Sequence, residues 1–180
     1  ATDVAGNQSS SVTSAIFSVD SVPPSTTLSA LHISSDTATN SDFVTSSGSQ
    51  TISATLSQPL GSDQLLGSVD AGVTWTDISN KVSGTNLIWD SAALVRGNSS
   101  IQLKVVDAAG NIGPIATQIY TYDPVAPSLM AANAGGSSLT LKIAESGSGL
   151  VASSVPATNA FSVSVGNSSI VVDSVTLDSV

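Results

Sequence analysis

Acidic side chains recur where this chain could pass from one structural unit to the next. Asp20 and Asp123 each stand four residues before a proline, Pro24 and Pro127. A carboxylate in a short linker can reach loops of both neighbouring units. Such a position suits Ca²⁺, which takes six to eight oxygen ligands at about 2.3–2.6 Å. Both linkers are therefore candidate calcium sites.

A polar loop supplies further oxygen ligands. Residues 35–42 hold two carboxylates, one amide and several backbone carbonyls. If the strand before this loop runs the length of a domain, about 30 Å, the loop lies at the same pole as the second linker. The candidate ligands at that pole are Asp36, Asn40, Asp42 and Asp123.

The turn at residues 107–111 is expected at the opposite pole. Asp107 would lie there near Asp20 and complete a second candidate calcium site. Asp and Asn are also ordinary turn residues, because their side chains bond their own backbone, and Gly110 can supply a positive φ. For each of these acids the sequence leaves two roles open, calcium ligand and turn residue.

The sequence gives little support to a catalytic function. His32 is the single histidine and lies within an expected strand, while cysteine is absent, so a zinc site of the usual ligands is excluded. Glu145 is the single glutamate and has no paired acid nearby in sequence, which argues against a glycosidase. The aromatic residues Trp75, Trp89, Tyr120 and Tyr122 could stack on sugars, but their alternation within strands favours packing. We expect no enzyme.

Composition narrows the class of protein further. The chain has 180 residues, of which 9% are charged, against roughly 25% in soluble domains. Its net charge of -9 disfavours nucleic acid and anionic membranes as partners by repulsion. The fold cannot rest on disulfides without cysteine. No apolar run of membrane-spanning length occurs, so no membrane insertion is expected.

The turn and linker acids belong to a repeated segment of the sequence. The sequence VVDAAGN at residues 105–111 returns as ATDVAGN at residues 1–7, and each copy leads to an acid-bearing linker. Asp20 and Asp123 are spaced by roughly 103 residues, the size of one β-sandwich domain. We expect the chain to be a slice of a longer array.

Short alternating segments bounded by turns predict an all-β fold, an antiparallel Greek-key sandwich. The strands expected in it are 26–34, 43–45, 50–57, 64–69, 73–78, 86–89, 100–107 and 115–122. Residues 70–72 are expected to form a tight turn, and residues 91–98 a short one. The expected core includes Trp75, Trp89 and Leu87, with two alternating sets that comprise Ile52, Ala54 and Leu56, and Ile101, Leu103 and Val105.

Three units are expected along the chain. Residues 1–23 are interpreted as the tail of a preceding domain plus linker, with a turn at 4–7 and a strand up to Val19. Residues 24–125 form a complete domain. Residues 126–180 do not repeat it and are interpreted as a partial β-sandwich module, with strands at 138–143, 161–165 and 171–177.

The middle domain resembles the Ig-like tandem repeats of giant bacterial surface adhesins and biofilm-associated proteins of the RTX type. The resemblance rests on ISSDTATNSDFVT (33–45), TLSQPL (55–60), VDAGVTWTDIS (69–79), VVDAAGNIG (105–113) and YTYDPVAP (120–127). The later segment SSVPATNAFSVSV (153–165) is similar to the SwmB-type repeat of such proteins. The resemblance implies an Ig-like sandwich in an extracellular rod whose interdomain joints are stiffened by Ca²⁺.

The expected function follows from these features. The chain would be a structural spacer of a bacterial cell-surface adhesin, which projects a distal binding domain for cell adhesion or biofilm formation. Its partners would be the neighbouring domains of the same chain. Two alternatives stay open: a glycan- or protein-binding module, and an accessory domain of a secreted enzyme.

Overall fold

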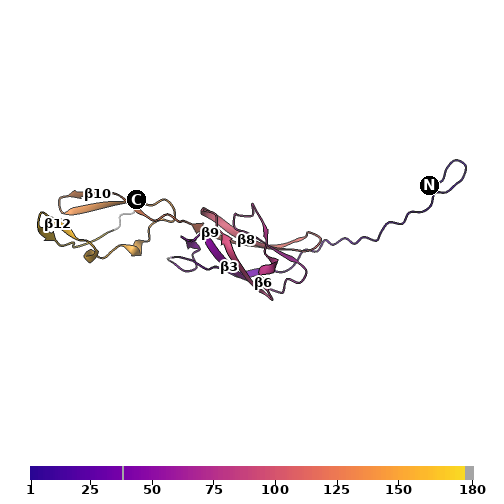
Figure 1. The fold of residues 1–180 in the computed structure, drawn as a ribbon, viewed down its shortest axis with the longest axis horizontal. Helices are drawn as coiled ribbons and strands as arrows, with labels where there is room; N and C mark the ends of the chain where they lie inside the picture. Colours follow the sequence, from indigo (N-terminus) through magenta and orange to yellow (C-terminus); the bar gives the residue numbers. More distant parts are fainter. Residues whose placement is uncertain (38, 177–180) are drawn as a thin grey trace.

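The computed structural model describes residues 1–37 and 39–176. Figure 1 shows a β-sandwich in the middle, an extended N-terminal arm on one side and a C-terminal segment of short strands on the other. The chain therefore enters and leaves the sandwich at opposite ends.

The sandwich has two sheets with an immunoglobulin-like strand order. One sheet is antiparallel with the order β1-β3-β7-β6; its strands are β1 (Leu28–Ile33), β3 (Ser49–Leu56), β7 (Asn86–Ala93) and β6 (Val82–Ser83). The other has the order β2-β9-β8-β4-β5; its strands are β2 (Val44–Thr45), β9 (Ile112–Tyr122), β8 (Gly97–Val106), β4 (Gln64–Ser68) and β5 (Thr76–Asp77). Among the described strands, only β2 and β9 pair in parallel. The expected all-β Ig-like sandwich is confirmed.

The core lies between the two sheets, where alternation along each strand delivers apolar side chains. Ile52 on β3 and Ile101, Leu103 and Val105 on β8 are fully buried, and Leu56 is 2% exposed. Leu87 and Trp89 join them from β7. Both expected alternating sets are thus confirmed, because side chains of a strand point to opposite faces with period 2.

Trp75 is not a core residue, which corrects the expectation from sequence. It is half-buried outside β5, and the ammonium group of Lys104 lies 3.7 Å from its ring centroid, a cation–π contact. The reason is the turn before it, where the Asp70 carboxylate accepts the Thr74 N–H at 2.9 Å. This bond lengthens the turn, so β5 begins only at Thr76 and Ile78 takes the inward position.

The remaining strands match the expectation with two differences. All eight expected strands of the sandwich have a counterpart, and β6 has none among the expected segments. The turn expected at residues 91–98 is shorter, because β7 continues to Ala93 and β8 begins at Gly97. The 3-10 turn η1 (Ser79–Lys81) joins β5 to β6.

The N-terminal arm forms its turn but not its strand. Thr2 and Gln8 make an isolated antiparallel bridge around the turn. Residues 9–19 pair with no strand of the described residues, and Ile16 and Phe17 are exposed. The strand expected there is wrong for this structure, because a strand needs a hydrogen-bonding neighbour.

The C-terminal segment forms two small hairpins, β10–β11 and β12–β13. Its elements are β10 (Ser128–Gly135), β11 (Ser138–Ala144), η2 (Ala152–Ser154), η3 (Thr158–Ala160), β12 (Val163–Val165) and β13 (Ser168–Ile170). Residues 171–176 are not a strand, and the rest of the strand expected there lies outside the described residues. No side chain described after Asp123 is buried, so this segment adds nothing to the core.

No helical element in the described ranges is long and apolar enough to cross a membrane.

Tyr120 ties the two sheets together. It is 1% exposed, and its hydroxyl donates to the Val69 carbonyl at 2.6 Å and accepts the Val95 N–H at 2.9 Å. Val69 follows β4 in one sheet and Val95 follows β7 in the other, so one phenol bridges both.

We expect Tyr120→Phe to lower the free energy of unfolding by about 1–2 kcal/mol, because both bonds are lost while the ring stays. Urea denaturation measures it. Tyr122→Phe is the control, because the Tyr122 hydroxyl makes no hydrogen bond with the described residues. Its effect is expected to stay within about 0.5 kcal/mol, and equal losses in the two variants would contradict the bridging role.

Candidate functional site

The two copies of the repeated turn have the same hydrogen bonds. Asp107 Oδ1 accepts the N–H groups of Ala109 and Asn111 at 2.9 and 2.8 Å, and its Oδ2 accepts Asn111 Nδ2 at 2.8 Å. The first copy repeats this set with Asp3, Ala5 and Asn7, each bond at 2.9 Å. The repeated sequence therefore encodes one repeated local structure.

The geometry explains both the glycine and the acid of the turn. Gly6 and Gly110 have φ of 88° and 89°, a region that favours glycine. The bond from the Asn111 side chain is the main reason that the pKa of Asp107 lies below its ordinary value. The turn role expected for Asp107 is thus observed, and a calcium role stays a prediction.

The N-terminal joint is closed by this turn. Asn111 Nδ2 donates to the backbone carbonyl of Asp20 at 3.2 Å. Gly113 packs so closely on the linker that a Cβ there would lie 2.7 Å from the Pro24 carbonyl oxygen. The turn at residues 107–111 thus lies next to Asp20, as expected from sequence.

The C-terminal joint is centred on Asp123, which is 9% exposed. Its Oδ1 accepts the Val125 N–H at 3.1 Å, and its Oδ2 accepts the N–H and hydroxyl of Ser148 at 2.8 and 3.0 Å. Its own N–H donates to the Thr45 carbonyl at 2.9 Å. Asp123 therefore bonds both the sandwich and the segment that follows it.

The two linkers share a local structure as well. Asp20 Oδ1 accepts the Val22 N–H at 3.0 Å, the counterpart of the bond from Val125 to Asp123. A carboxylate that accepts the N–H two residues ahead forms an Asx turn, which sets the direction of the linker.

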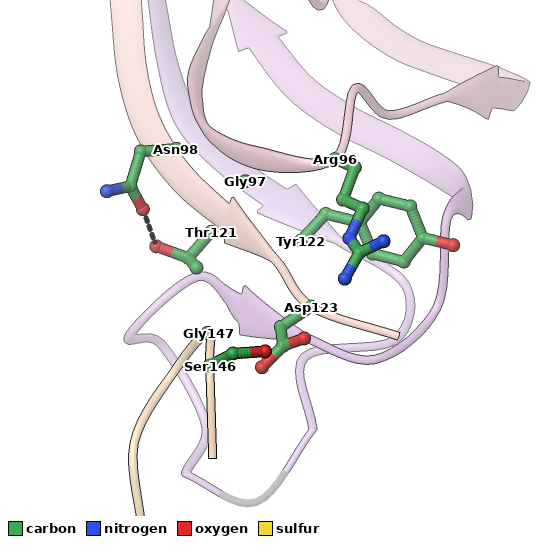
Figure 2. A pocket seen from close by; sticks show the side chains of 8 residues that line it. All are labelled: Arg96, Gly97, Asn98, Thr121, Tyr122, Asp123, Ser146 and Gly147. Atoms are coloured by element: carbon green, nitrogen blue, oxygen red, sulfur yellow. Dashed lines mark hydrogen bonds between the residues drawn. The ribbon is translucent and has the colours of Figure 1, made fainter. Parts of the chain in front are cut away.

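A glycine makes the C-terminal joint possible. Figure 2 shows Ser146 and Gly147 directly beside the Asp123 carboxylate. A side chain at Gly147 would overlap that carboxylate. Glu145 Oε1 accepts the Gly147 N–H at 2.8 Å, which helps to hold this loop in place. Sequence reasoning places neither Gly147 nor Ser148 at the joint; their only signal is the run Gly147-Ser148-Gly149.

The polar loop at residues 35–42 reaches the same pole through β2. Asp36 Oδ2 accepts the N–H groups of Ser41 and Phe43 at 2.6 and 3.4 Å, and Asp42 Oδ1 accepts the Val44 N–H at 2.9 Å. Ala38 of this loop lies outside the described residues. Asp36 Oδ1 is buried and has no hydrogen-bond partner among them, which is unusual for a carboxylate oxygen.

The expected calcium ligands are not gathered into one cluster. β2 pairs with Thr121 and Tyr122, so the loop and Asp123 share a pole as expected. Asn40 is exposed on that loop. Across the described ranges, no three His, Cys, Asp or Glu side chains lie close enough to hold one ion. Asp36 and Asp42 instead accept N–H groups of their own loop, and Asp123 accepts N–H groups of Val125 and Ser148.

His32 and Glu145 are the two residues whose types and single occurrence bear most directly on catalysis. His32 is exposed on β1, as expected for an outward-facing strand residue. Glu145 accepts an N–H from Gly147, the residue packed against Asp123, so its loop lies near a second acid that its sequence neighbours do not indicate.

Searches of protein-family models, curated proteins and solved structures found no match to this chain.

We expect Gly147→Ala to open the C-terminal joint while leaving the sandwich intact. The added methyl group displaces the loop, and the two bonds from Ser148 to Asp123 are lost. Small-angle X-ray scattering should show a larger radius of gyration, with the urea midpoint of the sandwich unchanged. Gly135→Ala is the control, because a Cβ there meets nothing within 4 Å; an equal expansion in the control would contradict the prediction.

The joint is also expected to loosen in acid. The Ser148 N–H is the main reason that the pKa of Asp123 lies below its ordinary value of 3.8. A pKa lowered by the closed joint means that closure is favoured above about pH 4 and is lost as the pH falls through the lowered pKa. The radius of gyration should therefore stay constant from pH 7 down to about pH 4 and rise as the pH falls further.

Asp123→Asn separates this effect from general acid unfolding. Asn keeps one oxygen acceptor but no charge, so the variant should have a partly opened joint at pH 7. The rise in the radius of gyration that comes from protonation of Asp123 should be absent from this variant. An identical rise in the variant and the natural chain would show that another group is responsible.

Proposed function

We propose that this chain is a spacer segment of a large extracellular bacterial adhesin, which projects a distal binding domain for cell adhesion or biofilm formation. The observation that carries the proposal is the placement of the two linkers. The Pro24 linker packs on Gly113 near the start of β9, and Asp123 directly follows its end. Each sandwich thus adds the length of β9, about 35 Å, to the reach of the chain.

The repeated joint supports a tandem arrangement. The turns at residues 3–7 and 107–111 have the same bonds, and so do the Asx turns at Asp20 and Asp123. A unit whose end is built like the end of the preceding segment can be strung in series, so the partners we propose are neighbouring domains of the same chain. The lack of cysteine, the low charge content and the resemblance to surface adhesins favour an extracellular bacterial location.

Calcium is proposed as a further stiffener, mainly at the C-terminal pole. Asp36 Oδ1, buried and without a hydrogen-bond partner among the described residues, is an oxygen that a cation would satisfy. Asn40, Asp42 and Asp123 lie at the same pole and would have to move toward Asp36 to share one ion, because no three carboxylates of the described residues are grouped there. At the other pole no buried side-chain oxygen of the described residues lacks a hydrogen-bond partner, and Asn111 already bridges to Asp20, so the fit is poorer. A bound Ca²⁺ would supply a charge that neighbouring carboxylates share.

The calcium part is tested by heating the chain in Ca²⁺ and in EDTA. EDTA should lower the melting temperature and raise the radius of gyration. Asp36→Asn should abolish both differences, because the orphaned carboxylate charge is removed. Asp90→Asn is the matched control: it deletes one acidic charge on β7, where Asp90 pairs with Lys81. Identical curves with and without Ca²⁺ would contradict calcium binding and leave the hydrogen-bonded joint untouched.

The spacer part is tested by changing the number of sandwiches. Inserting a second copy of residues 24–125 should lengthen the particle by about 35 Å, measured as its maximum dimension by small-angle scattering. A particle that grows wider without growing longer would contradict the spacer function.

A further inference from the structure

A cavity of about 210 Å³ lies at the C-terminal joint. Figure 2 shows its walls: the start of β8, the end of β9 and the loop that follows β11. The lining residues are Arg96, Gly97, Asn98, Thr121, Tyr122, Asp123, Ser146 and Gly147. It is thus bounded by two segments that the joint brings together, and its volume suits one small molecule.

The cavity presents hydrogen-bonding groups that the fold does not use. Arg96 is exposed and makes no hydrogen bond or ion pair with any residue in the described ranges. Asn98 Oδ1 accepts the Thr121 hydroxyl at 2.7 Å, which orients the amide and leaves Nδ2 without a partner among the described residues. The Ser146 hydroxyl is likewise unengaged there. These groups can donate to a ligand, and Asp123 Oδ1, with one bond made, can still accept.

One wall is an aromatic ring held in place. The Tyr122 ring packs so tightly on Gly48 that a Cβ there would lie 2.6 Å from it. Figure 2 shows Arg96 beside the same ring. A fixed, partly exposed ring next to hydrogen-bonding side chains offers an apolar π surface on one side of a ligand and polar groups on the other.

The charged side chains that line the cavity disfavour a charged ligand. Arg96 opposes a cation in the cavity, while Asp123 opposes an anion. A ligand that suits the cavity is neutral, both donates and accepts hydrogen bonds, and has one apolar face.

We propose that this cavity binds one neutral pyranose residue of a glycan. A pyranose has hydroxyl groups for Arg96, Asn98 and Asp123 and a C–H face for Tyr122. The site goes beyond the spacer function and shares Asp123 with the calcium ligands proposed above. Because Ser146 and Gly147 come from the far side of the joint, the sugar would contact both segments.

The test is a titration of the ¹⁵N-labelled chain with the methyl glycosides of glucose, galactose and mannose, followed by NMR. At least one should shift the amide signals of Gly97, Asn98, Thr121 and Gly147 in a saturable manner, with a Kd of about 1 mM. Glucuronic acid and glucosamine, charged counterparts, should bind at least about tenfold more weakly. Tighter binding of either would overturn the assignment to a neutral sugar.

Two variants complete the test. Arg96→Gln, at an exposed position, should weaken binding of the best glycoside about tenfold. Lys104→Gln removes the same charge beside Trp75 and should leave the Kd unchanged. The proposal is overturned if no glycoside shifts the cavity signals up to about 50 mM, if the shifts centre on Trp75, or if Arg96→Gln leaves the Kd unchanged.

Discussion

A carboxylate that accepts backbone N–H groups is the interaction on which both joints depend. Asp123 accepts N–H groups from its own linker and from Ser148, and Asp107 holds the turn whose Asn111 reaches Asp20. Aspartate suits this role because its short side chain stays close to the backbone. Such bonds set direction without a large apolar interface, so the same few residues can end one domain and orient the next.

Hydrophobic burial stops where the second joint begins. The fully buried side chains come from the sandwich, and Tyr120 is the last large one. Within the described part of the chain, the later hairpins leave Leu129 and Met130 more than half exposed. The contact between Asp123 and the loop at Ser148 is therefore polar and small. A joint of this kind resists bending only while its few bonds persist, which makes it sensitive to acid and to a single added methyl group.

Much of the sandwich could be predicted because its strands are half-buried and alternate. Ile52 and Leu103 lie inward as the period of two requires. Trp75 lies outside the core because the side chain of Asp70 extends the turn before it. The large size of the tryptophan side chain predicts burial and does not reveal this turn. Only part of the joint could be predicted from the sequence. Asp123 stands out because an acid recurs at both linkers. Ser148 lies 25 residues after Asp123, in a run that indicates only a turn. Arg96 carries no sequence signal, since its place at the cavity depends on the pairing of β8 with β9.

The most direct test of the joint is the distance distribution between spin labels on either side of it. The chain has no cysteine, so Thr55→Cys on β3 and Ala132→Cys on β10, both exposed, give two unique label sites. Double electron–electron resonance at neutral pH should give a narrow distribution, which broadens when Asp123→Asn is added. A broad distribution in the chain that retains Asp123 would contradict the account.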